Sequence, residues 1–160
     1  MTLTAAIRDV LAGVTTATLT TVLLKKGLRR TWMRGPRPLR TGQARAVGTA
    51  FTLRFIPARE DLATPESWSS PRSTRAAIEA MPEGVVVVAG TEGVAAAGIF
   101  GDILCSRMAR RGVAALVTEG AVRDAAGVRG TGLPVWCAAE VAPPSVAALT
   151  FVNWEEPVGC

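Results

Sequence analysis

The chain has 160 residues, of which 49% are apolar, and it carries a formal net charge of +5 with no histidine. This length and composition fit one compact α/β domain with a substantial core, and they exclude a disordered chain. Without histidine the chain has no Ser-His-Asp triad, no histidine general base and no zinc site of the usual Cys/His type. Acid–base chemistry would therefore fall to carboxylates, arginine or water.

Two helices are predicted at the N-terminus, over Leu3 to Leu11 and over Thr15 to Leu28. The second ends at Gly27, and Lys25 and Lys26 in its last turn suit the helix dipole. Its many threonines lower the intrinsic helix propensity, so we expect packing to stabilise it.

The segment from Lys25 to Arg59 is strongly basic and contains no acidic residue. Such a cluster is typical of contacts with nucleic acid or with an acidic partner. The alternative is a solvated loop whose cations pair with another subunit or bind an anionic substrate. We favour this alternative and expect no nucleic-acid partner, because Trp32 alone makes no aromatic platform and no nucleic-acid motif is present. The basic residues are Lys25, Lys26, Arg29, Arg30, Arg34, Arg37, Arg40, Arg45, Arg54 and Arg59.

A strand is predicted over Val47 to Phe55, followed by an irregular loop over Pro57 to Arg72 that is rich in proline, serine and charge. A loop of this length in a compact domain is more often functional or interfacial than idle. Ser73 can cap a helix over Thr74 to Met81, and Val85 to Val88 is predicted as a buried parallel strand.

The stretch from Gly98 to Asp124 carries two clusters of functional residue types, Gly98 to Asp102 and Glu119 to Asp124. The amphipathic spacing between them predicts a helix that ends near Gly112, and Val113 to Val117 is typical of a strand buried on both faces. A helix and a strand of these lengths bring both clusters to one edge of a parallel sheet. Open α/β folds place their ligands at that edge.

The first cluster has the features of an anion site. Gly98 and Gly101 are expected to let the backbone bend tightly before the helix. The first amides of that helix, those of Asp102, Ile103 and Leu104, have no intrahelical partner and favour a carboxylate or phosphate.

The second cluster adds a cation and a carboxylate. Arg123 presents a planar fork of donors that suits a carboxylate or a developing enolate, and Asp124 offers hard oxygens for a divalent cation. With the helix amides they would form a site for a 2-oxo acid, and would stabilise the enolate left when the bond between carbons three and four breaks. The structural alternative is a surface ion pair between Arg123 and Asp124, with Asp102 serving only the helix dipole.

The chain beyond Asp124 is predicted to continue the sheet. A short helix or turn is predicted over Ala125 to Thr131, and another strand over Leu133 to Ala138. Pro143 and Pro144 then interrupt regular structure, because proline lacks the backbone donor.

The remaining features concern the cysteines and the compartment. Cys105, Cys137 and Cys160 lack the spacing of metal ligands, and Cys105 and Cys137 lie in apolar stretches that predict packed thiols rather than nucleophiles. No apolar run approaches the roughly 20 residues that cross a bilayer, and the N-terminus lacks the pattern of a signal peptide. We expect a cytoplasmic protein that does not enter a membrane.

The order of these motifs resembles the RraA-like family. The resemblance rests on Gly101-Asp102, a helix ending in Arg111-Gly112-Val113, a hydrophobic strand, the run Glu-Gly-Ala-Val-Arg-Asp at 119–124, and Leu133 to Val135. It extends over nearly the whole chain. The family includes the regulator of ribonuclease activity A and the 4-hydroxy-4-methyl-2-oxoglutarate aldolases, which are divalent-metal-dependent pyruvate aldolases that also decarboxylate oxaloacetate. The resemblance implies a layered α/β/α fold with a central mixed, partly barrel-like sheet.

The resemblance also implies a role for each residue of the two clusters. Asp124 would hold Mg²⁺ or Mn²⁺, partly through water, and Arg123 would act in catalysis by contacting the pyruvyl group and stabilising its enolate. Asp102 would contact metal-bound water or take part in proton transfer. The amides of Ile103 and Leu104 would bind the substrate carboxylate. The residues that would bind the substrate are thus Gly101, Asp102, Ile103, Leu104 and Arg123.

Two functions follow from the resemblance. The first is a class II pyruvate aldolase or oxaloacetate decarboxylase, acting on a small 2-oxo acid as a homotrimer or homohexamer with sites at subunit boundaries. The second is a non-catalytic regulator that binds a ribonuclease or another protein through its basic segment. A methyltransferase-like activity lacks support, because Gly98-x-x-Gly101 lacks the remainder of a dinucleotide fingerprint.

Two departures from the family pattern affect these expectations. An aspartate expected near Thr20 or Thr21 in many relatives is absent, which suggests a subgroup. Relatives also continue past the position of Cys160 into further strands and a helix. We therefore expect residues 1–160 to form a single domain that is shortened at its C-terminus and exposes a sheet edge.

Overall fold

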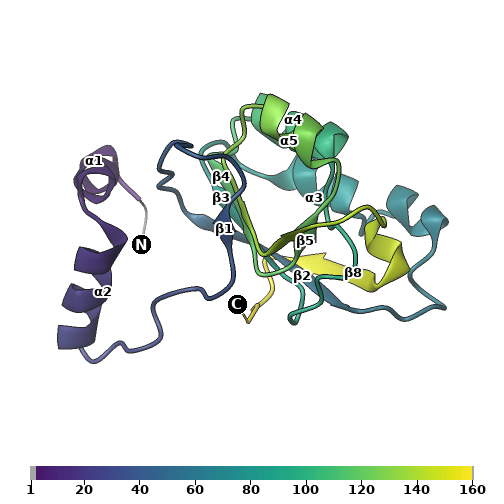
Figure 1. Ribbon diagram of the computed structural model, residues 1–160, viewed down its shortest axis with the longest axis horizontal. Coiled ribbons are helices and arrows are strands. Elements are labelled where there is room, and N and C mark those ends of the chain that lie inside the picture. Colours follow the sequence, from purple (N-terminus) through teal and green to yellow (C-terminus); the bar gives the residue numbers. More distant parts are fainter. Residues whose placement is uncertain (1–2, 160) are drawn as a thin grey trace.

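The computed structural model describes residues 3–159, and its elements are labelled in Figure 1. The helices are α1 (Ala5–Gly13), α2 (Thr16–Lys25), α3 (Thr74–Ala80), α4 (Asp102–Arg110) and α5 (Ala125–Gly130), with short 3₁₀ helices η1 (Pro65–Ser69) and η2 (Ser145–Ala147). The strands are β1 (Arg37–Pro38), β2 (Ala50–Pro57), β3 (Val86–Gly90), β4 (Ala115–Thr118), β5 (Ala121–Val122), β6 (Val135–Cys137), β7 (Ala139–Glu140) and β8 (Leu149–Trp154).

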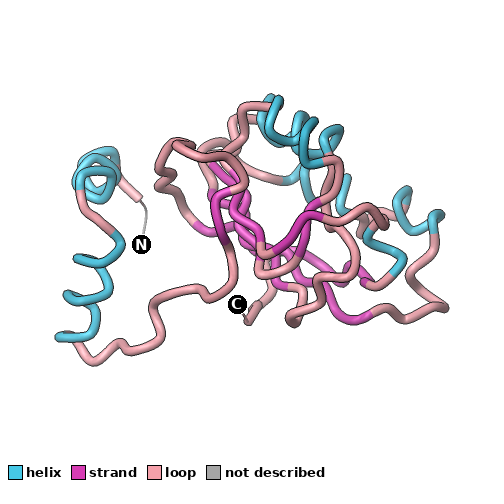
Figure 2. The backbone as a smooth tube through the Cα atoms, in the orientation of Figure 1, coloured by secondary structure: helices cyan, strands magenta, loops and turns pink. Residues whose placement is uncertain are grey.

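A six-stranded mixed sheet forms the centre of the fold, in the order β1-β6-β4-β3-β2-β8 (Figure 2). Strands β6, β4, β3 and β2 run parallel, and β1 and β8 pair antiparallel at the two edges. Strands β5 and β7 form a second, two-stranded parallel sheet. The predicted α/β fold with a central mixed sheet is confirmed.

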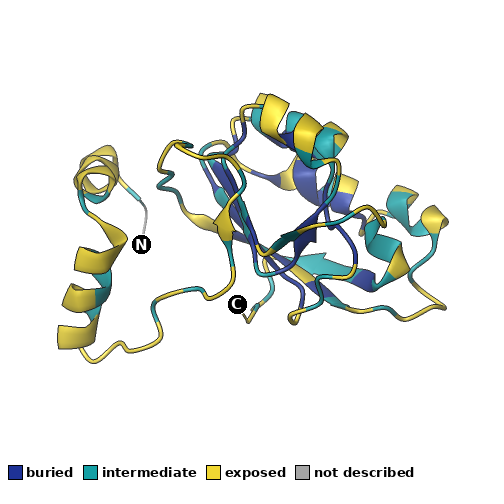
Figure 3. Cartoon of the chain, viewed as in Figure 1, coloured by how far each residue is buried: buried dark blue, intermediate teal, exposed yellow. Residues whose placement is uncertain are grey.

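The core lies on the parallel strands and on the helix faces turned toward them (Figure 3). Val87 on β3 and Leu116 on β4 are completely buried, as expected for strands covered on both faces. The buried ring of Phe55 packs edge to face on Phe100 and Phe151, with ring centroids 6.3 Å and 5.1 Å apart. Phe100 precedes α4, so this aromatic cluster ties the start of that helix to β2 and β8.

Cys105 on α4 and Cys137 on β6 are free, buried thiols, which confirms the prediction that they pack in the core. Burial raises the pKa of Cys105 to about 12 and also raises the pKa of Cys137. Cys160 lies outside the described residues.

Helices α1 and α2 stand apart from the sheet (Figure 1). Each is capped by a threonine hydroxyl: Thr4 accepts from the amide of Ile7, and Thr15 from the amide of Thr18. Gly27, at φ +86°, follows α2 at the predicted end. No residue of either helix is buried by the described chain, so the packing expected for α2 is not supplied within residues 3–159.

Length and apolarity decide whether a helix of residues 3–159 could cross a bilayer. No single helix there is long and apolar enough to cross a bilayer. Helices α1 and α2 reach that length only when taken together, and they are bent by 108° at their junction.

The loop that follows β3 and the loop that follows β4 are joined by backbone hydrogen bonds. The amide of Ile99 donates to the carbonyl of Ala121, and the amide of Arg123 donates to the carbonyl of Phe100, both at 2.9 Å. On the other side of the segment that precedes α4, the amide of Gly98 donates a hydrogen bond to the carbonyl of Pro143, which follows β7. The segment before α4 is therefore held between two neighbouring stretches of chain.

Gly98 and Gly101 make this contact possible. A Cβ on Gly98 would lie 2.6 Å from the amide nitrogen of Arg123, and a Cβ on Gly101 would lie 2.6 Å from Oδ2 of Asp124. Gly101 has φ −116° and ψ −169°, an extended conformation open to any residue. The backbone does bend at residues 96, 97 and 99, but neither glycine has a positive φ. What requires glycine at both positions is the second loop, which lies against them.

Replacing Gly98 by alanine should lower the free energy of unfolding by about 1–3 kcal/mol, because the new methyl group overlaps the backbone of the second loop. Urea unfolding followed by circular dichroism measures this change. Gly130→Ala is the matched control: no atom lies within 4 Å of its added methyl group. It should leave stability unchanged or raise it by up to about 1 kcal/mol, and equal losses in both variants would contradict the close contact.

The raised pKa of Cys105 keeps its thiol protonated at about pH 8, where an ordinary thiol is already partly ionised. Iodoacetamide should therefore leave Cys105 unmodified in the folded protein and label it after unfolding in urea. Mass spectrometry of tryptic peptides locates the label. Rapid modification of Cys105 in the folded protein would show that this thiol is accessible and ionised.

Candidate functional site

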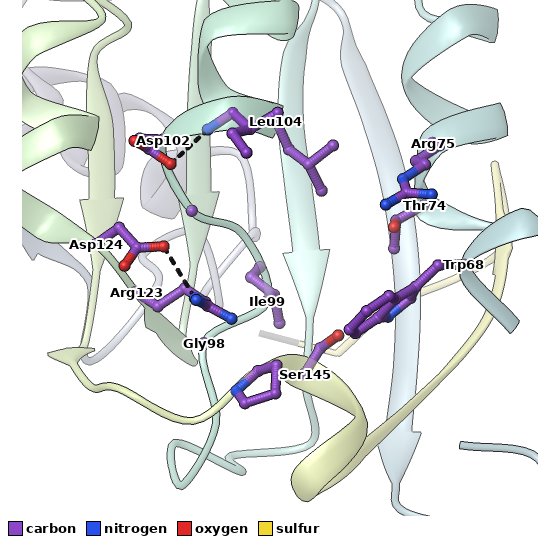
Figure 4. Close-up of a pocket in the computed structure, with 13 residues that line it drawn as sticks. Trp68, Thr74, Arg75, Gly98, Ile99, Asp102, Leu104, Arg123, Asp124 and Ser145 are labelled. Atoms are coloured by element: carbon purple, nitrogen blue, oxygen red, sulfur yellow. Dashed lines mark hydrogen bonds and ion pairs between the residues drawn. The ribbon is translucent and has the colours of Figure 1, made fainter. Parts of the chain in front are cut away.

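An open cavity of about 250 Å³ lies where the two loops meet (Figure 4). The structure brings all of the predicted site residues to this cavity: Gly101, Asp102, Ile103, Leu104, Arg123 and Asp124. The first four begin α4 and the last two precede α5. The predicted meeting of the two clusters is thus present in the geometry, while the chemical role of each residue stays a prediction.

Asp124 occupies the N-cap position of α5 in the left-handed region, with φ 51° and ψ 41°. Aspartate tolerates this conformation better than most residues. Its Oδ2 accepts a hydrogen bond of 2.9 Å from Nε of Arg123, and the two side chains are 46% and 36% exposed, respectively. The ion pair of the structural alternative therefore exists.

This ion pair uses only part of each group. Within residues 3–159, the terminal guanidinium nitrogens of Arg123 and Oδ1 of Asp124 have no hydrogen-bond partner. Both side chains line the cavity (Figure 4). Donors for an anion and an oxygen for a cation thus remain available at the same place.

The start of α4 differs in one respect from the expectation. The amide of Ile103 donates to Oδ1 of Asp102 at 2.8 Å, so this amide is not free, because the aspartate side chain folds back onto its own helix end. The amide of Leu104 has no partner among the described residues and stays available to an anion. Ile103 as a whole residue is 79% exposed and lines the cavity.

The fit of a divalent cation depends on the oxygen donors at this cavity. Residues 3–159 contain no group of three or more His, Cys, Asp or Glu side chains that could hold a metal ion. Mg²⁺, however, is commonly bound through one or two carboxylates and retains several waters. Asp124, with Asp102 on the same rim of the cavity, fits a hydrated ion of this kind (Figure 4).

Glu119, the first residue of the second cluster, does not line this cavity. Its Oε1 accepts from the amide and hydroxyl of Thr91 and from the amide of Gly93. It therefore holds the loop after β3 in place and has a positioning role.

The opposite wall of the cavity was not predicted residue by residue. It is formed by Trp68 of η1, Thr74 and Arg75 at the start of α3, and the start of η2 around Ser145. The guanidinium of Arg75 lies over the Trp68 ring, 6.0 Å from its centroid. The only sequence signal for this wall is the unusual length of the loop after β2, which contributes Trp68.

Comparisons with known proteins agree with this fold. The family model described as RraA-like: Aldolase/RraA matches residues 4–160. The crystal structure of Streptomyces coelicolor RraAS2, described as an unusual member of the RNase ES inhibitor RraA family, is 33% identical, with a TM-score of 0.83 over 97% of this chain and 73% of that one. The RNA-processing inhibitor RraA from Thermus thermophilis has a TM-score of 0.60 at 22% identity, over 82% of this chain and 70% of that one, which shows the shared fold alone.

A curated relative extends beyond the matched part. Protein DlpA of Legionella pneumophila is 30% identical over 101 residues, which make up 63% of this chain but only 15% of DlpA. The chain therefore matches a small part of that longer protein. Since the family model matches nearly the whole sequence and the fold agrees with solved members, the chain belongs to the RraA-like family, described as Aldolase/RraA.

Proposed function

We propose that this chain is a divalent-metal-dependent lyase that releases pyruvate from a 4-hydroxy-2-oxo acid, or from oxaloacetate by decarboxylation. The observation that carries the proposal is the single cavity shared by Arg123, Asp124, Asp102 and the free amide of Leu104. The family, whose description includes aldolases, supports the same class of reaction. We further propose a homotrimer or homohexamer as the working assembly.

Substrate binding would use the two sources of positive charge. The free amide of Leu104 and the positive end of the nine-residue helix α4 suit the substrate carboxylate. The terminal nitrogens of Arg123 suit the neighbouring 2-oxo oxygen. Asp124 would hold the divalent ion with its unpaired oxygen, and when bound the ion supplies further positive charge beside the developing enolate.

Asp102 would begin the cleavage by accepting the proton of the 4-hydroxyl group. The bond between C3 and C4 then breaks, a carbonyl forms at C4, and the electron pair of the broken bond enters the enolate over C3, C2 and the 2-oxo oxygen. Arg123 stabilises that negative charge. Transfer of that proton from Asp102 to C3 then yields pyruvate and restores the carboxylate of Asp102. With oxaloacetate the same bond breaks, CO₂ leaves and the same enolate remains.

Arg123→Ala and Asp124→Ala should each lower pyruvate release from oxaloacetate by about a hundredfold to a thousandfold in the presence of Mg²⁺ or Mn²⁺, because they remove charge that acts on the enolate. A coupled assay with lactate dehydrogenase measures the rate. Removing a half-exposed ion pair costs at most about 1 kcal/mol of stability. In Asp124→Ala, alanine in the left-handed conformation costs roughly a further 1–2 kcal/mol, so circular dichroism should show that both variants stay folded.

Arg129→Ala is the matched control for this experiment. Arg129 on α5 also forms a partly exposed ion pair, with Glu140, but it does not line the cavity. The rate of pyruvate release by Arg129→Ala should stay within about twofold of the wild-type rate, since a surface substitution away from the cavity changes stability and activity little. Equal rates in the wild type and all three variants would remove the proposed site.

A second candidate is a non-catalytic regulator that binds a ribonuclease. Its specific support is the 33% identity to RraAS2, which is described as belonging to a ribonuclease-inhibitor family. The basic segment between Lys25 and Arg59, whose cations are largely exposed, is the proposed contact surface.

If the basic segment binds a partner, a pull-down from cell extract should retain the ribonuclease at low salt and lose it at high salt, because salt screens exposed charges. Arg29→Ser combined with Arg30→Ser should weaken retention, and Arg123→Ala should not change it. Retention that changes neither with salt nor on replacing Arg29 and Arg30 by serine would argue against the electrostatic surface.

A further inference from the structure

The starts of α4 and α5 meet at a close contact between Asp102 and Gly127. A Cβ on Gly127 would lie 2.7 Å from Cβ of Asp102 and 2.9 Å from its Oδ2, closer than Cβ atoms come to other atoms in proteins. Any side chain at position 127 would therefore force the side chain of Asp102, and with it the first turn of α4, away from α5.

Local structure gives no other reason for a glycine at position 127. Gly127 lies inside α5, where glycine lowers helix stability because it loses the most backbone freedom on folding. Its φ is not positive, so its backbone conformation is open to any residue. The contact with Asp102 is the feature of the structure that requires glycine at this position.

Asp124 packs against a glycine of the other helix start in the same way. A Cβ on Gly101 would lie 2.6 Å from Oδ2 of Asp124. Gly101 directly precedes Asp102 at the start of α4, and Gly127 lies three residues after Asp124, one turn along the same face of α5. The two glycines thus seat the two carboxylates on one side of the cavity, where Figure 4 shows them.

The charge of Asp102 is not balanced by the described chain. Its Oδ1 accepts from the amide of Ile103 at 2.8 Å, but within residues 3–159 Asp102 forms no ion pair. Asp124, in contrast, pairs with Arg123. Two carboxylates on one side of a cavity repel each other, and a divalent cation beside them offsets that repulsion. Mg²⁺ and Mn²⁺ prefer carboxylate and water oxygens of this kind.

We propose that Gly127 is a positioning residue, whose missing side chain lets the carboxylate of Asp102 stand beside that of Asp124, so that the affinity of the cavity for a divalent cation depends on Gly127. This inference rests on the proposed function for the cation at Asp124. Gly127 contacts neither the cation nor the substrate and acts only through Asp102.

The affinity for Mn²⁺ alone tests this role, measured without substrate from the electron paramagnetic resonance signal of free Mn²⁺. Gly127→Ala should weaken binding about tenfold, as substitutions next to metal-site residues commonly do. Asp102→Asn should weaken it by a similar factor. The double variant should bind no more weakly than either single variant, because both substitutions act through one carboxylate.

Gly130→Ala is the matched control, because it makes the same substitution in the same helix with no atom within 4 Å of the added methyl group. It should bind Mn²⁺ as wild type does. If Gly127 served only the packing of α4 on α5, Gly127→Ala would lower stability, yet the folded variant, identified by circular dichroism, would keep the wild-type affinity. That result, equal weakening in both alanine variants, or a wild type that does not bind Mn²⁺ would overturn the positioning role.

Pyruvate release from oxaloacetate, above the rate without protein, separates this inference from the proposed function. If the Mn²⁺ affinity depends on Gly127 but wild type releases no pyruvate, the lyase function fails and the positioning role stands. If wild type and Gly127→Ala release pyruvate at equal rates and bind Mn²⁺ equally, the positioning role fails and the lyase function stands.

Discussion

The contact between the loops that follow β3 and β4 is the constraint on which the rest of this structure depends. These loops come from parallel neighbours in the sheet, and their backbones pair through Ile99, Phe100 and Arg123. Buried peptide groups must find hydrogen-bond partners, so two loops packed this closely are most stable when they pair with each other. Gly98 and Gly101 supply the space, because any Cβ there would overlap the second loop.

The chemistry of the cavity follows from that contact. It places the free amide at the start of α4 beside a half-exposed ion pair at the start of α5. An ion pair of this exposure adds little to stability. Opposite it, Arg75 has no carboxylate partner among the described residues, and Glu79 pairs with Arg107 and Arg111 instead. The cavity is therefore lined by two arginines, Arg75 and Arg123, and by two carboxylates, Asp102 and Asp124.

Much of the fold could be predicted because its signals are local. The amphipathic spacing before Gly112 predicted α4, and the run of valines predicted β3. Ser73 was predicted to cap α3, and its hydroxyl does accept a hydrogen bond from the amide of Ala76. The strand predicted from Val47 to Phe55 begins at Ala50 and runs to Pro57, because pairing with β3 and β8 sets its ends and propensity does not. The predicted loop after β2 contains η1, which the proline and serine content concealed.

The sequence by itself predicted the five helices, the strands β2, β3, β4 and β6, and the meeting of the clusters at 98–102 and 119–124 at one edge of the sheet, since periodicity and strand direction are properties of short stretches. Strands β1, β5, β7 and β8 were not predicted. Only the tertiary structure decided why Gly98 and Gly101 are glycines, which helix amide stays free, and that Trp68, Thr74 and Arg75 complete the cavity. These features depend on contacts between residues far apart in the chain. Such contacts arise from packing and from competition for partners, as when two arginines of α4 and its C-cap occupy Glu79, and no local pattern records them.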